Sequence, residues 1–115
     1  MEPLKQFLAQ AKSADLRDKE MFAFVVREGL TLTGMSVRDA GELFRTAPGT
    51  VSRWENGHTA PALVARYAVR DLLVNRVTRI ASALDQRVSI ARENISSGFH
   101  GLDSFQRTRS ALVVA

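Results

Sequence analysis

The 115-residue sequence predicts an all-α protein. Apolar residues recur at spacings of three and four along most of the chain, as they do on the buried face of a helix. Helix-capping residues, glycine and proline divide residues 1–61 into short segments. Neither glycine nor proline occurs from Ala62 to Ser97, so that this stretch favours helix over an unusual length.

The amino-terminal third predicts two amphipathic helices. Residues 1–15 form an amino-terminal segment, and the first helix covers about residues 1–12 of it. The apolar face of this helix consists of Leu4, Phe7, Leu8 and Ala11. Ser13 or Asp15 can cap a second helix from about Leu16 to Leu30 or slightly beyond. Residues 31–34 are either its last turn or a loop.

Two short helices follow, with signals at both ends. Ser36 is a suitable cap for a helix that ends near Phe44, and the link of residues 45–47 is three residues long. Pro48 favours a helix start and Gly57 a helix end, so residues 48–56 are predicted to form a short closed helix. Within it, Val51 and Trp54 share one face, which we assign to the core.

This pair of helices resembles the helix-turn-helix of the lambda-repressor-like (Cro/XRE-type) family. That family's pattern has a Gly-Leu-Ser opening, a small residue in helix two, and a turn leading into Thr-Val-Ser-Arg-Trp-Glu-Asn-Gly. Gly34-Met35-Ser36 matches the opening, Ala40-Gly41 the small pair, and residues 50–57 the whole final run. The resemblance covers roughly residues 20–75 and implies a DNA-binding domain, which we place at residues 16–75.

Three positions depart from the family's pattern. Arg45 stands where the turn usually has glycine, and Ala47 stands where a serine usually caps the recognition helix, with Thr46 as a substitute cap. Leu30 replaces the arginine of helix one that usually pairs with the residue at Glu55. Arg27, one turn earlier, is our candidate for that partner.

The resemblance and the side-chain chemistry together predict a DNA interface. A short helix with small polar residues and an arginine suits the major groove, where arginine can contact guanine through two hydrogen bonds. Arg53 is the candidate for that contact or for a phosphate at the groove edge, and Gly49 allows the backbone to approach DNA. The predicted DNA-binding residues are Arg38, Arg45, Pro48, Gly49, Thr50, Ser52 and Arg53.

The carboxy-terminal part predicts a long helix and an irregular tail. We divide residues 62–97 near Asn75 into a helix that completes the domain and a helix at 76–97; the alternative is one continuous helix. From Val77 onward the apolar residues step by three or four, which predicts pairing with a second copy, whereas the alternative is packing back on the domain. The tail, residues 98–115, ends in an apolar segment that can dock, add a strand or stay free.

Composition disfavours other classes of protein. The net charge of +4 and the pI near 10.3 favour a polyanionic partner. There is no cysteine, His58 and His100 have no neighbours at ligand spacing, and no glycine-rich phosphate loop or catalytic triad is present, so we expect no metal, cofactor or enzyme activity. No apolar run approaches the ~20 residues of a membrane span, and no export signal is evident. We therefore expect a cytoplasmic, nucleoid-associated protein without membrane contact.

These features predict a transcriptional regulator that binds double-stranded DNA. A homodimer would read a near-palindromic operator, and repression by occluding a promoter is the simplest mechanism. The alternative is a protein-interaction module or an antitoxin, in which the long helix and the tail bind a small partner protein such as a toxin.

Overall fold

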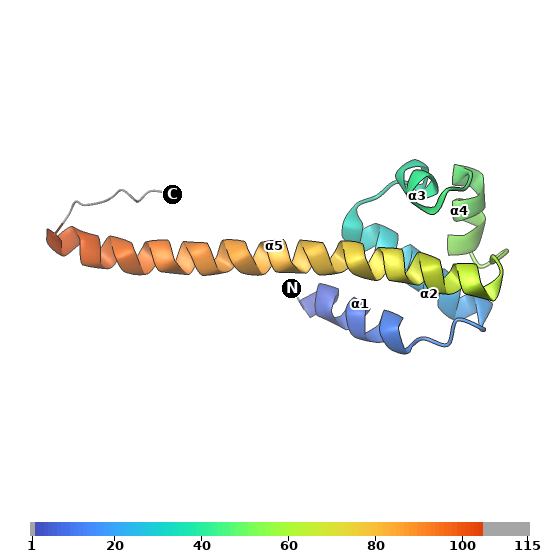
Figure 1. Cartoon of the computed structure of the whole chain (residues 1–115), viewed down its shortest axis with the longest axis horizontal. Coiled ribbons are helices and arrows are strands. Elements are labelled where there is room, and N and C mark those ends of the chain that lie inside the picture. Colours follow the sequence, from blue (N-terminus) through green and yellow to red (C-terminus); the bar gives the residue numbers. More distant parts are fainter. Residues whose placement is uncertain (1, 105–115) are drawn as a thin grey trace. The chain divides into compact units, whose positions relative to one another are not determined.

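The computed structural model describes the backbone of residues 2–104 and the side chains of residues 2–92. Over these residues the chain forms helices and no strand, which confirms the all-α prediction with a long carboxy-terminal helix (Figure 1). The helices are α1 (Glu2–Ser13), α2 (Lys19–Thr33), α3 (Val37–Phe44), α4 (Pro48–Glu55) and α5 (Leu63–Ser104). Packing divides the chain into two units, residues 1–81 and 82–115.

All five helices contribute to one core in the first unit. Its largest fully buried side chains are Leu16, Phe22, Val25, Val26, Val51, Leu73 and Val77. Helices α2 and α5 approach closely at Gly29, where an added Cβ would lie 2.9 Å from Leu73 Cδ1. This close approach lets the first part of α5 cover α2.

The junction between α1 and α2 is a turn, so α2 begins later than the apolar pattern indicates. Asp18 is the N-cap, and its carboxylate accepts the Glu20 N–H at 2.9 Å. The prediction of Ser13 or Asp15 as the cap, with a start at Leu16, was wrong. Leu16 is fully buried, but it enters the core from the turn, which the Asp18 N–H closes on the Asp15 carbonyl at 3.1 Å.

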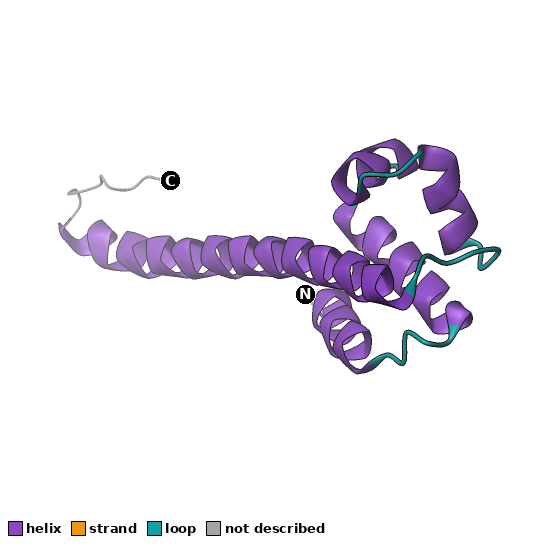
Figure 2. Ribbon diagram, turned by 45° about the vertical axis from the view of Figure 1, so that its right-hand side comes forward, coloured by secondary structure: helices purple, strands orange, loops and turns teal. Residues whose placement is uncertain are grey.

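Helix α2 ends at Gly34, which adopts the left-handed conformation with φ 72°. The Gly34 N–H donates to the Thr31 carbonyl at 3.3 Å. Residues 31–33 are therefore the last turn of the helix and not a loop. Figure 2 shows that short loops join the helices throughout the described chain.

Helix α5 is continuous from Leu63 to Ser104, so the predicted division near Asn75 was wrong. Val69, Leu73 and Val77 are buried at spacings of four, and this face passes through the predicted break without interruption. The helix begins two residues after Pro61 and includes residues 98–104, so the prediction of an irregular tail from residue 98 was wrong for these residues. A glycine inside a helix costs only about 1 kcal/mol and keeps its N–H, so Gly98 and Gly101 need not end it. The apolar segment 111–115 lies outside the described residues.

In the described part of the chain, none of the helices combines the length and the apolar character that a membrane span requires.

Candidate nucleic-acid interface

Helix α3 has the predicted start and an unusual end. The Ser36 hydroxyl accepts the Asp39 N–H at 3.0 Å, which confirms Ser36 as the cap. Arg45 follows the last helical residue in the left-handed conformation, with φ 59° and ψ 50°. A non-glycine residue in this conformation costs roughly 1–2 kcal/mol, which explains why glycine suits this position better. The turn forms nevertheless, and the Thr46 N–H donates to the Gly41 carbonyl at 2.8 Å.

Gly41 makes the tight turn between α3 and α4 geometrically allowed. A Cβ at this position would lie 2.7 Å from the Thr46 carbonyl oxygen and 3.3 Å from the Pro48 nitrogen. Both atoms belong to the backbone, so neither can rotate away as the end of a side chain can. The small residue at position 41 is therefore required by the packing of the turn against α3.

Helix α4 starts at Pro48, with Ala47 as its N-cap. No side chain caps this end, so the substitute cap predicted at Thr46 was wrong. The N–H groups of Thr50 and Val51 donate to the Ala47 carbonyl at 3.0 and 3.2 Å. The amino-terminal end of α4 thus lacks the side-chain oxygen that commonly stabilises a helix start.

Replacing Ala47 with serine is expected to stabilise the fold by about 1 kcal/mol, because its hydroxyl can accept an N–H of the first turn. Thermal denaturation followed by circular dichroism measures the change. A loss of stability in Thr46→Ala together with no gain in Ala47→Ser would instead assign the cap to Thr46.

The carboxy-terminal end of α4 is closed as the sequence predicts. Gly57 has φ 78°, and the His58 N–H donates to the Arg53 carbonyl at 2.9 Å. The Gly57 N–H donates to the Trp54 carbonyl at 3.1 Å, which completes a Schellman motif. The Asn56 side-chain amide donates to the Ser52 carbonyl at 2.9 Å, so Asn56 also helps to close this end of the helix.

One face of α4 is held in the core by aromatic contacts. Val51 is fully buried and Trp54 is 7% exposed. The Trp54 ring lies 5.8 Å from the Phe22 ring at 66° and 6.3 Å from the Phe44 ring at 35°, both centroid distances. The assignment of Trp54 to the core is confirmed, and α4 is anchored to both α2 and α3.

Arg27 does contact Glu55, but through the main chain. Its guanidinium donates from Nη1 to the Glu55 carbonyl oxygen at 3.0 Å, and neither of the two ion pairs formed among the described residues involves the Glu55 carboxylate. A cation at the carboxy-terminal end of a helix stabilises the carbonyl groups exposed there. Arg27 therefore joins α2 to the end of α4, and only the partner atom differs from the prediction.

The opposite face of α4 is open. We call Gly49, Ser52 and Arg53 the open face of α4, because their spacing of three and four places them on one side of the helix. Gly49 and Arg53 are exposed and Ser52 is half-buried. The Arg53 guanidinium donates to the hydroxyl of the half-buried Thr50 at 3.1 Å and so lies along the first turn of the helix.

A second group of predicted residues surrounds a hollow beside the turn. Arg38, Arg45 and Pro48, all exposed, line a hollow of about 510 Å³ together with Gly41, Glu42 and Thr46. The structure thus places the seven predicted residues in two adjacent groups, one on the first turns of α4 and one around the turn before it. Glu42 is not among the residues predicted from the sequence, although its position four residues after Arg38 indicates that the two share a helix face. This carboxylate disfavours an anion at its own edge of the hollow.

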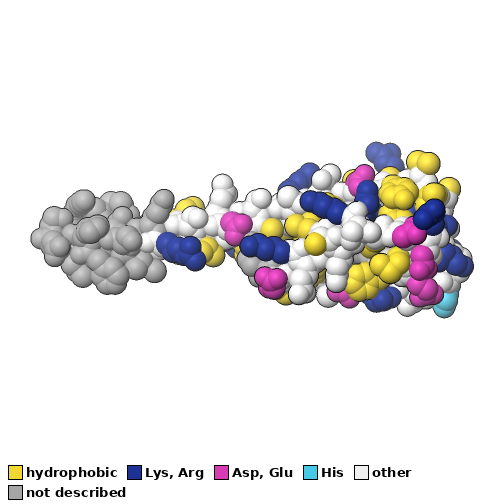
Figure 3. Space-filling model, turned by 90° about the horizontal axis from the view of Figure 1, so that it is seen from below, with side chains coloured by type: hydrophobic (Ala, Val, Ile, Leu, Met, Phe, Trp, Pro, Cys, Tyr) yellow, Lys and Arg dark blue, Asp and Glu magenta, His cyan; other side chains and the backbone are white. Residues whose placement is uncertain are grey.

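Some arginines of α5 have structural partners instead. Arg66 donates from Nε to the Pro61 carbonyl at 2.8 Å and from Nη1 to the Leu16 carbonyl at 2.9 Å, so it ties together two loops. Arg70 pairs with Asp71 at 3.0 Å and lies 5.1 Å from the centre of the Tyr67 ring. Arg66 therefore stabilises the fold through these two carbonyl groups. Figure 3 shows basic, acidic and apolar side chains interspersed over one face of the molecule.

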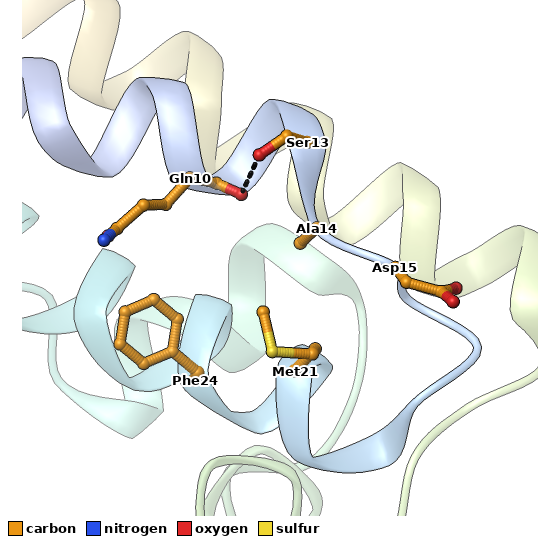
Figure 4. A pocket seen from close by; sticks show the side chains of 6 residues that line it. All are labelled: Gln10, Ser13, Ala14, Asp15, Met21 and Phe24. Carbon is orange, nitrogen blue, oxygen red and sulfur yellow. Dashed lines mark hydrogen bonds between the residues drawn. The ribbon is translucent and has the colours of Figure 1, made fainter.

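An apolar hollow of about 490 Å³ lies between α1 and α2 (Figure 4). Its lining includes Gln10, Met21 and Phe24. The side chains of Ser13 and Asp15, which also line it, already have partners within the protein. Ser13 donates to the Ala9 carbonyl at 3.0 Å, and Asp15 pairs with Arg17 at 3.0 Å. The hydrogen bond from Arg17 also lowers the pKa of the Asp15 carboxyl below its usual value. This hollow offers little directional chemistry, so the candidate site remains the α3–α4 surface.

No protein-family model, no curated protein and no solved structure matches this chain.

Proposed function

We propose that this protein is a sequence-specific regulator that binds double-stranded DNA, with α4 in the major groove. One observation carries the proposal: Trp54 and Val51 lock one face of α4 into the core while Arg53 and its neighbours lie open on the other. A helix fixed in this way needs no further ordering of its backbone on binding.

The open face carries the chemistry that base recognition needs. Arg53 can donate two hydrogen bonds to the N7 and O6 atoms of guanine after leaving the Thr50 hydroxyl. Thr50 and Ser52 can donate to bases or phosphates, and Gly49 adds no side chain between the backbone and DNA. These residues account for the reading part of the interface.

The arginines beside the turn account for the positioning part. Arg38 and Arg45 line one hollow beside the start of α4 and can hold DNA phosphates there. The net charge of +4 adds a general attraction to the DNA backbone. A homodimer would present two copies of α4 to half-sites separated by one helical turn, roughly 34 Å, or by a multiple of it, and would act most simply as a repressor.

Loss of the Arg53 side chain is expected to weaken specific binding about 10- to 100-fold, because one bidentate base contact contributes ~1–3 kcal/mol of discrimination. The measurement is a mobility shift with DNA from the protein's own promoter region, across a salt series and with unrelated DNA as competitor. Wild-type binding should resist the competitor and weaken with salt.

Arg17→Ala is the matched control for that experiment, because it removes one exposed positive charge whose partner is Asp15. It should leave specific binding almost unchanged. Binding that unrelated DNA competes away, or equal losses in Arg17→Ala and Arg53→Ala, would overturn the proposal. The long helix and the tail would then be the functional part, as the protein-interaction alternative requires.

A further inference from the structure

Helix α5 carries an apolar stripe along its exposed part. We call Ala81, Leu84, Val88 and Ala91 the α5 seam, because their alternating spacing of three and four keeps them on one line. Val88 is 44% exposed, Ala91 is exposed, and Ala81 and Leu84 are half-buried. An alternating spacing over this length is the pattern that one helix of a coiled coil buries against another.

Charged side chains flank the seam on both sides. Asp85 and Arg92 lie on one flank, each one residue after a seam position, and Arg87 lies on the other flank, one residue before Val88. All three are exposed. The ion pairs among the described residues are Arg17 with Asp15 and Arg70 with Asp71, so the described part of the chain supplies no ion-pair partner for these three.

We propose that the α5 seam pairs in antiparallel orientation with the α5 seam of a second copy, with Val88 opposite Ala91. This places Asp85 beside Arg92 of the second copy, and the two-fold symmetry repeats that ion pair. Like flanks face each other in an antiparallel pair of helices, which is why Asp85 and Arg92 meet. The inference rests on the proposed function in that it identifies the second copy of the dimeric regulator.

The other arrangements of the same seam bring like charges together. In a parallel pair, the residue just before a seam position on one helix lies beside the partner residue that is five positions further along the chain. Arg87 would then face Arg92 of the second copy. Sliding the antiparallel pair by seven residues would place Asp85 against Asp85 and Arg87 against Arg87. The charge pattern therefore selects one orientation and one register.

The first test measures the oligomeric state of the full chain by analytical ultracentrifugation without DNA. Wild-type protein should be dimeric at micromolar concentration, and Leu84→Asp combined with Val88→Asp should make it monomeric with unchanged helix content. Ser82→Asp combined with Ser89→Asp adds the same charge at two exposed positions off the seam and should stay dimeric. A monomeric wild type, or a dimer that persists in the seam variant, would overturn the proposal.

Charge exchange tests the orientation. Asp85→Arg and Arg92→Asp should each weaken the dimer about 3- to 10-fold, because two ion pairs become like-charge contacts, and the double exchange should restore it. In a parallel dimer Arg92→Asp would instead tighten association, because it would face Arg87. Tightening by Arg92→Asp, or no restoration in the double variant, would overturn the antiparallel pairing.

Dimerisation through the α5 seam and specific DNA binding are measured separately, so each can fail while the other holds. If the wild type dimerises through the seam but binds no specific DNA, the α5 pairing stands and the proposed regulatory function fails. If the seam variant remains dimeric and its DNA binding still depends on Arg53, the α5 pairing fails and the proposed regulatory function stands.

Discussion

Replacing Trp54 with alanine is expected to destabilise the fold by about 3–5 kcal/mol, the range typical of deleting a large buried aromatic side chain. Trp54 is 7% exposed and packs against both Phe22 and Phe44. Its loss leaves a cavity at the point where α2, α3 and α4 meet. Chemical denaturation followed by circular dichroism measures the effect, because Trp54 is the only tryptophan and the variant has no indole fluorescence.

Arg53→Ala is the natural comparison, since it removes a large side chain from the adjacent but exposed position. Its effect on the free energy of unfolding should stay within roughly 0.5 kcal/mol. The two variants thus separate the anchoring face of α4 from its open face. Similar losses of stability in both would contradict the assignment of Trp54 to the core.

Gly41→Ala is expected to cost about 1–3 kcal/mol, because overpacking at a rigid site forces the backbone to shift. The added methyl would lie 2.7 Å from the Thr46 carbonyl oxygen, and the turn cannot widen without moving α4. Thermal and chemical denaturation both report this change.

Gly49→Ala is the matched control within the same helix pair. The nearest atom to its added methyl is Arg53 Nη1 at 3.8 Å, an ordinary contact with a flexible side chain. Alanine is favoured over glycine in a helix by up to about 1 kcal/mol, so this variant should be unchanged or more stable. Equal destabilisation by the two substitutions would show that the close contact at Thr46 does not limit the fold.

Part of the candidate site follows directly from the sequence. The ends of α3 and α4 depend on local chemistry at Ser36, Pro48 and Gly57, and these residues act within one turn of the positions they cap. Which side chains of α4 are buried follows from the helical period, so Trp54 is separated from Arg53 without tertiary information. That Arg38, Arg45 and Glu42 share one hollow depends on the turn, whose geometry no local pattern specifies.

The helical class, the apolar faces and the two short helices that carry the candidate site follow from the sequence alone, because periodicity and capping are local. The three-dimensional fold was needed to show that Asp18 caps α2, that Arg45 takes a left-handed conformation, and that Arg66 binds the Leu16 carbonyl. The fold was also needed to show that α5 continues past Asn75, because Leu73 and Val77, on either side of that position, are buried on the same helix face. The positions of Arg66 and Leu73 depend on contacts with Leu16 and Gly29, which are far away in the chain, and packing there outweighs local preference. The Asp18 and Arg45 outcomes rest on hydrogen bonds within a few residues, at helix ends that the sequence pattern left open.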